Sequence, residues 1–542
     1  MWQQVYDPLD NTWLSALMAA VPILVFLLGL TVLKLTGVKA AISSLMITWV
    51  IGLFVFGLPL GATASASLYG VLAGLWPIAW IVLMAVWLYR IALRAGNFEV
   101  IRSSITNISR DQRIQVLLIA YCFGGFMEGA AGFGIPIAIC AALLVNLGFQ
   151  PLKAAMLALV ANAAAGSYGA IGIPVIVGAQ QGGVPLNDLS VMMVWVTVMI
   201  TFFVPFLLMM ILDGLRGLKE TFAPALISGA VFAGLQGLVL ILLGPELADI
   251  IPPLAAMVAL AAFMRVWSPQ KIYRETGAPA VEELEQTTVG VRRIVAAWRP
   301  FYVLSLAILL WSTPLLAKLT GPEGPLSWTT LRFPMPALHE QIVKVSPIVA
   351  EDTPVQAVWK LPLVAASGTA ILLAVIITVL TTRSITWRQS FEELGGTVRQ
   401  LGLPIIMICL VMAVANVMSF AGMSSAIGLA LAKAGGMFPL LSPIIGWIGV
   451  FVTGSVVNNN TLFAGLQSVT AAQIGANQTL LVASNTAGGL VAKVVSPQSI
   501  AIATAAVDQA GRESALMRMA LKYSLMLLAF VCLWVFALSL FL

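Results

Sequence analysis

Residues 126–134 read Phe-Met-Glu-Gly-Ala-Ala-Gly-Phe-Gly and interrupt an apolar stretch that extends from Val116 to Leu147. A helix that crosses a bilayer needs ~20 mostly apolar residues, so this stretch is too long for one crossing. Glycine in such a break lets backbone approach a ligand closely. Because irregular backbone is tolerated in a bilayer only where protein or a watery cavity satisfies its amides, the pattern predicts a segment that turns back beside a central site.

The composition around this stretch is that of a membrane protein. Of the 542 residues, 60% are hydrophobic and 9% are charged, whereas soluble proteins carry about 25% charged residues. Apolar stretches recur from Trp13 to Leu542 and predict an all-α integral membrane protein with roughly 12–14 transmembrane segments. The N-terminus is polar and lacks a basic region, so no cleavable signal peptide is expected. The net charge of +6 needs no nucleic-acid partner, since Lys and Arg cluster beside helix ends.

These basic residues predict the topology. The connections 90–113, 216–219, 265–299, 383–399 and 512–522 are rich in Arg and Lys and are expected in the cytoplasm. Both termini and the Pro-rich stretch 320–360 are then expected outside. Three apolar segments lie between the first two of these connections, but a return to the same side needs an even number of crossings. One segment must therefore turn back.

Short motifs of the first half recur in the same order in the second half. The matched pairs include Trp76-Pro77-Ile78 with Leu403-Pro404-Ile405, Met84-Ala85-Val86 with Met412-Ala413-Val414, and Asn162…Pro174 with Asn485…Pro497. The first helix of this series is predicted to end at a basic region and its counterpart to begin at one, which indicates an inverted-topology repeat with re-entrant hairpins and broken helices. The chain then divides into a first half (1–267, repeat core 68–182), a cytoplasmic connection (268–299) and a second half (300–542, repeat core 395–507).

Two charged residues lie inside the predicted breaks. Glu128 is the candidate proton-coupling residue, because a carboxyl within a membrane can hold and release a proton. The alternative is a neutral glutamate that caps unwound backbone. Lys493 could hold a substrate carboxylate as a point charge. Its alternatives are a structural pair with Glu128 and a lysine that extends to the membrane surface.

Uncharged polar side chains gather at three further breaks, within 162–174, 454–460 and 485–498. Their amides and hydroxyls can bond a carboxylate and a 2-hydroxyl group, and helix ends at such breaks offer free N–H groups to an anion. The candidate substrate-binding residues, besides Lys493, are Ser455, Asn458, Asn459, Asn460, Asn162, Tyr168, Ser496 and Gln498. Packing between helices is the alternative for the asparagine cluster, and local capping is the alternative for the other residues.

Motifs spread over nearly the whole chain carry a family resemblance. They include Trp2-Gln3-Gln4, Gly74-Leu75-Trp76-Pro77-Ile78-Ala79-Trp80, Glu128-Gly129-Ala130-Ala131-Gly132-Phe133-Gly134, Gly244-Pro245-Glu246-Leu247 and Ser496-Pro497-Gln498-Ser499-Ile500-Ala501. With these motifs the chain resembles the lactate permease family of bacterial 2-hydroxymonocarboxylate carriers, which includes glycolate permeases. The resemblance implies proton-coupled uptake of L-lactate, D-lactate or glycolate across the inner membrane. It also places Glu128, Lys493, Ser496 and Gln498 in signature segments.

The chain departs from the family's pattern at two of the breaks. The family's second hairpin commonly reads Gly-Ser-Asp-Thr/Ser-Ser-Asn, and here Val456 takes the place of the aspartate. The family's usual Asn-Thr-Ala-Pro is here the stretch 162–165, Asn-Ala-Ala-Ala. These departures leave open which acid is carried and whether the coupled ion is H⁺ or Na⁺.

We therefore expect a secondary transporter of lactate or a related 2-hydroxymonocarboxylate that works by proton symport and alternating access. No cofactor or metal is expected, and the energy would come from a proton gradient. The alternative within the same class is a Na⁺-coupled carrier of another small organic anion. An intramembrane enzyme is disfavoured, because the apolar core lacks histidine and a metal-ligand cluster. The expected partners are the carboxylate substrate and the lipid bilayer, and a homo-oligomer is compatible with the sequence.

Overall fold

The structure is a computed structural model that describes residues 1–106, 108–132, 134–275, 290–349, 351–382 and 384–542. In these ranges, ten helices are long and apolar enough to cross a membrane. Further apolar helices of 10–17 residues include the arms of the broken segments. The sequence predicted roughly 12–14 transmembrane segments, and the described residues contain these ten long helices and six shorter apolar ones.

The first half is helical apart from one short strand at the N-terminus. Its elements are β1 (Trp2–Gln3), α1 (Thr12–Thr31), α2 (Gly37–Phe54), α3 (Leu60–Ala73), η1 (Gly74–Ala79), α4 (Trp80–Arg94), α5 (Asn97–Thr106), α6 (Gln112–Val116), η2 (Leu117–Phe123), α7 (Gly124–Ala130), α8 (Ile135–Asn146), α9 (Pro151–Ala161), η3 (Asn162–Ala164), η4 (Ala170–Gly172), α10 (Ile173–Gly182), α11 (Leu186–Glu220), α12 (Phe222–Leu242), η5 (Pro245–Leu247) and α13 (Ile251–Phe263).

The second half adds four short strands before its long helices. Its elements are α14 (Val291–Ala297), α15 (Arg299–Trp311), α16 (Pro314–Thr320), η7 (Ser327–Thr329), β2 (Thr330–Pro334), β3 (Ile342–Lys344), β4 (Thr353–Pro354), β5 (Val358–Pro362), α17 (Ser367–Thr381), α18 (Trp387–Phe420), α19 (Met423–Ala432), η8 (Gly435–Met437), α20 (Phe438–Thr453), α21 (Val456–Gln473), α22 (Gln478–Lys493), α23 (Pro497–Ala506) and α24 (Glu513–Ser539). The predicted connection 268–299 lies partly outside the described residues.

Helix starts in the second half follow ordinary capping chemistry. Thr386 and Gln389 form a capping box at the start of α18, in which each side chain bonds the other residue's backbone N–H. The side chain of Asn477 accepts the Leu480 N–H at the start of α22 at 3.1 Å. Pro497 opens α23 at the first helical position, where its missing N–H costs nothing. The polar residues at these breaks therefore define where the helices begin.

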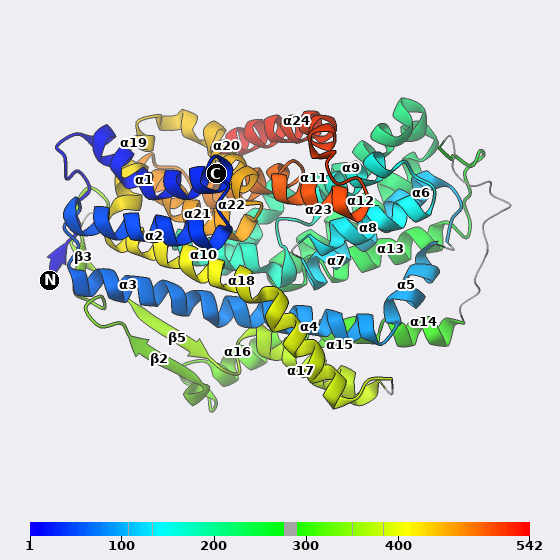
Figure 1. The fold of residues 1–542 in the computed structure, drawn as a ribbon, viewed down its shortest axis with the longest axis horizontal. Coiled ribbons are helices and arrows are strands. Elements are labelled where there is room, and N and C mark those ends of the chain that lie inside the picture. Colours follow the sequence, from blue (N-terminus) through cyan, green and yellow to red (C-terminus); the bar gives the residue numbers. More distant parts are fainter. Residues whose placement is uncertain (107, 133, 276–289, 350, 383) are drawn as a thin grey trace.

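Two long helical segments of the two halves run side by side in opposite directions (Figure 1). One extends over Leu60–Arg94 through α3, the π-helical segment η1 and α4, and the other is α18. Near the start of the first, a Cβ on Gly70 would lie 2.6 Å from the Ala413 nitrogen, late in α18. Near its end, Arg90 pairs with Glu393, early in α18, at 2.8 Å. This antiparallel arrangement confirms the inverted relation predicted for these two segments.

The predicted breaks are present in both halves and occur in the same order. A hairpin break separates α7 from α8 and another separates α20 from α21, and each is followed by a helix pair with an interruption, α9 to α10 and α22 to α23. In the first hairpin the Cys140 thiol on α8 donates to the Ile119 carbonyl of η2 at 3.2 Å. The two arms therefore lie side by side, and the segment turns back as predicted.

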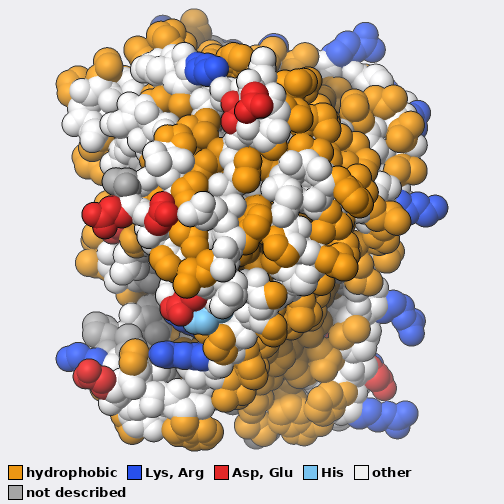
Figure 2. All heavy atoms as spheres, turned by 90° about the vertical axis from the view of Figure 1, so that its left-hand side faces the viewer, with side chains coloured by type: hydrophobic (Ala, Val, Ile, Leu, Met, Phe, Trp, Pro, Cys, Tyr) orange, Lys and Arg blue, Asp and Glu red, His pale blue; other side chains and the backbone are white. Residues whose placement is uncertain are grey.

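Short strands gather at one end of the molecule, which we call the sheet end (residues 2–3 and 330–362). β1 pairs in parallel with β3, which pairs antiparallel with β4, while β2 and β5 form an antiparallel ribbon. The all-α prediction did not include these strands. In Figure 2, which looks onto this end, hydrophobic side chains cover much of the visible surface. Exposed residues such as Leu17, Leu28 and Phe54 on α1 and α2 suit flanks that face lipid.

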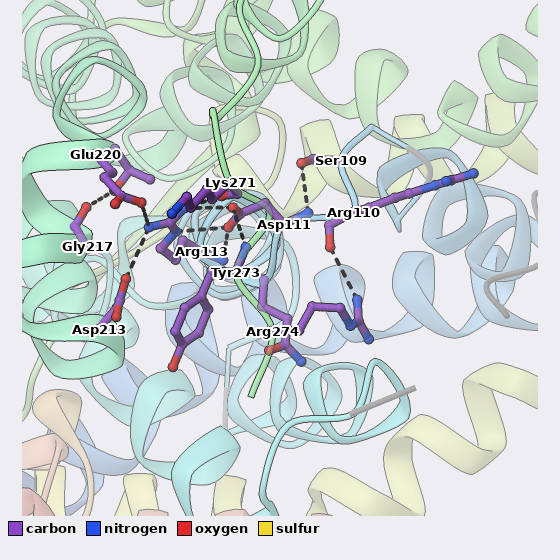
Figure 3. A network of polar contacts seen from close by, with 12 residues as sticks. Ser109, Arg110, Asp111, Arg113, Asp213, Gly217, Glu220, Lys271, Tyr273 and Arg274 are labelled. Carbon is purple, nitrogen blue, oxygen red and sulfur yellow. Dashed lines mark hydrogen bonds and ion pairs between the residues drawn. The ribbon is translucent and has the colours of Figure 1, made fainter. Parts of the chain in front are cut away.

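The opposite end, which we call the arginine end (residues 109–113, 213–220 and 271–275), is organised around Arg113 (Figure 3). From the sequence we interpreted Arg113 only as one of the basic residues that place a connection in the cytoplasm. In the structure its side chain is buried, with 1% exposed. Its guanidinium donates to Asp111 at 2.8 Å, Asp213 at 3.1 Å, Glu220 at 2.6 Å and the Lys271 carbonyl at 3.0 Å. Through these bonds Arg113 connects the start of the first hairpin with α11 and with the segment after α13.

Candidate functional site

A cavity of about 250 Å³ lies where the broken segments of the two halves meet. One wall comes from the first half, from Glu128, Gly134, Gly166, Gly169, Ala170, Ile173 and Pro174. A second wall comes from residues 454–458 together with Lys493 and Gln498, and a third comes from the middle of α18. The volume is at the small end of ligand pockets, which are usually about 300–1,000 Å³, and so suits a small organic molecule.

Four helices begin at this cavity. The residues that line it at these helix starts are Gly134, which precedes α8, Ile173 and Pro174 of α10, Ser455 to Asn458 at the start of α21, and Gln498 and Ser499 of α23. The first N–H groups of a helix lack intrahelical acceptors, and the helix dipole is positive at that end. Gly134 and Gly454 adopt left-handed φ angles of 82° and 68°, which glycine tolerates best. Four such ends around one cavity favour an anion.

An ion pair connects the two halves at the cavity wall. The Lys493 ammonium donates to Glu128 Oε1 at 2.5 Å, and the side chains are 11% and 1% exposed. The Asn162 amide donates to the other carboxylate oxygen, Oε2, at 2.9 Å. Lys493 is therefore paired and does not extend to the membrane surface. Glu128, Lys493 and Asn162, three of the predicted site residues, thus form one cluster.

Asn458 is the polar residue of the second hairpin that is free to meet a ligand. It lines the cavity, and neither of its amide atoms has a hydrogen-bond partner among the described residues. Ser455 also lines the cavity and caps α21, since its hydroxyl accepts the Asn458 N–H at 3.3 Å. Val456 is buried and lines the same wall, so the departure from the family pattern falls at this cavity.

The neighbouring asparagines do not line this cavity. Asn459 donates to the Asn485 carbonyl at 3.2 Å. Asn460 donates to the Pro174 carbonyl at 2.8 Å and to Thr486 at 2.9 Å, and it accepts from Asn485 at 2.9 Å. The structure thus places these two side chains between α10, α21 and α22, where they hold the helices together.

Of the remaining predicted residues, one lines the cavity and two do not. Gln498 is exposed within the cavity wall beside Gly454. Ser496 lies outside the lining and caps α23, where its hydroxyl accepts the Ser499 N–H at 3.3 Å. Tyr168 is buried away from the lining, and its hydroxyl is 2.7 Å from the Thr197 hydroxyl. The cavity therefore brings together Glu128, Lys493, Ser455, Asn458 and Gln498.

The cavity extends toward the arginine end. Its wall includes Gln400 of α18, whose side-chain oxygen accepts from Arg90 at 3.0 Å. Two further cavities, of about 320 and 150 Å³, lie at the sheet end beyond α10 and share Gln180, Gln181 and Lys344. Burial lowers the pKa of the Lys344 ammonium below its ordinary value. The Asn460 bond to the Pro174 carbonyl lies at the α10–α21 contact between the central cavity and these two.

Asp249, which follows η5, is not among the site residues predicted from the sequence. It is 2% exposed, and its backbone carbonyl and Cβ pack against Gly129, the neighbour of Glu128. The available signal was a second carboxylate, three residues after Glu246, at the start of an apolar run, in Glu246-Leu247-Ala248-Asp249-Ile250-Ile251. An acidic residue within a membrane segment is a functional candidate by default.

Comparison with known proteins agrees with the motifs. The family model described as L-lactate permease matches residues 15–542. An L-lactate permease of Halalkalibacterium halodurans is 47% identical over 543 residues, which cover 100% of each chain. Glycolate permease GlcA of Escherichia coli K12 is 42% identical over 97% of this chain and 95% of its own. A solved structure, the Alcanivorax borkumensis YdaH transporter, is a remote likeness, with 14% identity and a TM-score of 0.45 over 86% of each chain.

The family model thus covers nearly the whole chain, and both relatives align with it almost end to end. The matched range covers both halves, so the segments that form the cavity lie within it. The chain belongs to the L-lactate permease family.

Proposed function

We propose that the protein takes up L-lactate or a related 2-hydroxymonocarboxylate together with a proton, by alternating access to the central cavity. The names of its relatives, L-lactate permease and glycolate permease, support this substrate class. The observation that carries the assignment to the cavity is the group of four helix N-termini that surround it together with Lys493. One carboxylate can meet these donors, and the 2-hydroxyl group can bond the free amide of Asn458.

The ion pair offers a physical reason for coupling. While the cavity is empty, Lys493 neutralises Glu128 at 2.5 Å. A substrate carboxylate that takes over Lys493 would leave Glu128 as a buried anion without a cation, which costs several kcal/mol. A proton on Glu128 removes this cost. Substrate and proton therefore bind together, and the loaded site keeps the net charge of the empty one.

The orientation follows from the basic residues. By the positive-inside rule we place the arginine end in the cytoplasm and both termini outside. Because the cavity extends toward Gln400 and the arginine end, this conformation would release substrate into the cytoplasm. In the opposite conformation the α10–α21 contact at Asn460 would open toward the sheet-end cavities.

The test is uptake of labelled L-lactate by proteoliposomes that contain the purified protein. At equilibrium, a pH gradient of one unit, acid outside and without Na⁺, should sustain about tenfold accumulation for a 1:1 symport. Lys493→Met should abolish uptake, whereas the exposed Lys433→Met control should retain it.

Two results would contradict this proposal. Accumulation that requires a Na⁺ gradient and ignores pH would support the alternative, in which the free amide oxygen of Asn458 contributes to a Na⁺ site beside Val456. Absence of saturable L-lactate uptake and counterflow under either gradient would mean that the substrate class is wrong.

A further inference from the structure

Asp249 is a buried carboxyl group that the coupling scheme above does not use. Its Oδ1 accepts the Gln236 amide at 2.9 Å, while Oδ2 has no hydrogen-bond partner among the described residues. The described part of the chain also offers Asp249 no salt bridge, although its side chain lies 2% exposed in the core. An ionised carboxylate in such a place would be strongly destabilised, so the group holds a proton in this conformation.

Asp249 also lies beside the coupling ion pair. A Cβ on Gly129 would lie 2.9 Å from the Asp249 Cβ, so the two backbones touch directly next to Glu128. The charges of Glu128 and Lys493 both act on Asp249. The Lys493 ammonium is already engaged by Glu128, and an ionised Asp249 would therefore mainly meet a second negative charge.

A polar chain connects Asp249 to the first-half break. Gln236 Oε1 is 2.7 Å from the Thr201 hydroxyl, which is also 2.9 Å from the Ala164 carbonyl. Among the described residues, the buried phenols of Tyr121 and Tyr168 are further titratable groups on which the charge of Asp249 acts. Neither phenol carries a charge at neutral pH, so Glu128 and Lys493 determine the electrostatic environment of Asp249.

We propose that Asp249 is a second proton-binding site, which donates its proton to Glu128 when a substrate carboxylate takes over Lys493. The step converts Asp249-COOH and Glu128-COO⁻ into Asp249-COO⁻ and Glu128-COOH, and it conserves charge. Asp249 then regains a proton from solution, so each cycle still moves one proton. This inference rests on the proposed function and adds the group from which the coupling proton comes.

The experiment compares wild type with Asp249→Asn, whose side-chain oxygen can still accept the Gln236 amide. In proteoliposomes the variant should retain L-lactate counterflow, in which Glu128 can keep its proton, but its initial rate of pH-driven uptake should fall several-fold, because the coupling proton then reaches Glu128 without Asp249. Glu246→Gln is the matched control, because Glu246 lies three residues away and bonds only Ser367 among the described side chains. The control should accumulate like wild type.

A second measurement does not depend on transport. Time-resolved infrared difference spectra recorded after addition of L-lactate at constant pH should show, in wild type and in Glu246→Gln, transient loss of the carbonyl band of protonated Asp249 together with gain of the carbonyl band of protonated Glu128. In Asp249→Asn the first of these two bands should be missing. A wild-type rate of pH-driven uptake in Asp249→Asn, or presence of the first band in that variant, would overturn the inference. Failure of wild type itself to accumulate L-lactate under a pH gradient would instead refute the proposed function.

Discussion

Replacing Lys493 with methionine should destabilise the protein by about 3–5 kcal/mol, the usual cost of removing one partner from a buried ion pair. The structure indicates the upper part of this range, since Glu128 is 1% exposed and would keep only the Asn162 amide as a donor. Glu128→Gln should cost a similar amount, because it leaves the Lys493 ammonium buried and unpaired. In the double variant no charge remains, so most of the loss should be recovered.

The assay is reversible unfolding of the purified variants in mixed micelles, which gives the free energy of unfolding for wild type, both single variants and the double variant. We expect the double variant to be closer to wild type than either single variant, so that the interaction energy in this double-mutant cycle exceeds the loss in either single variant, about 3–5 kcal/mol. It also predicts that the loss in Lys493→Met shrinks at lower pH, because a proton on Glu128 removes the unpaired charge. Additive losses without pH dependence would refute the reasoning.

Three further predictions concern the packing of α22, substrate binding and the arginine end. Gly446→Ala should lower the free energy of unfolding by about 1–3 kcal/mol, because its Cβ would overlap a backbone carbonyl of α22. Gly395→Ala is the control: a Cβ at this position would meet open space, so the substitution should be neutral or stabilising in the same unfolding assay. Asn458→Ala should raise the KM for L-lactate about tenfold with little loss of stability, and Asn460→Ala should mainly lower stability, since only the latter loses bonds to the protein. Arg113→Leu should cost about 3–5 kcal/mol because the buried Asp111 carboxylate loses its cation.

The breaks could be predicted because glycine runs and polar clusters in an apolar chain have few structural explanations. The hairpin around residues 124–134 and the start of α23 at Pro497 both lie where the sequence indicated. The pairing of Glu128 with Lys493 was one of several interpretations, since spacing along the chain contains no information about a contact over 365 residues. The structure shows this pair, because the fold brings Glu128 of the first half next to Lys493 of the second half.

Other features depend on partners that no local pattern reveals. Arg113 can be buried because it forms ion pairs with Asp213 and Glu220, which lie about a hundred residues later in the chain and reach it at the arginine end. Asn460 resembled a ligand-binding residue but lies turned toward Pro174 of the other half. Asp249 was overlooked because two carboxylates three residues apart after a Gly-Pro pair resemble a loop between helices until the fold places Asp249 against Gly129.

The central claim is that the cavity between the two halves binds the substrate carboxylate. Ile502→Cys places a thiol in its wall, while the four native cysteines are buried. The rate at which a small thiol reagent labels this variant should fall several-fold in saturating L-lactate, and acetate, which lacks the 2-hydroxyl group, should protect more weakly. Labelling that L-lactate leaves unchanged, in protein that still transports it, would contradict the account and move the site elsewhere.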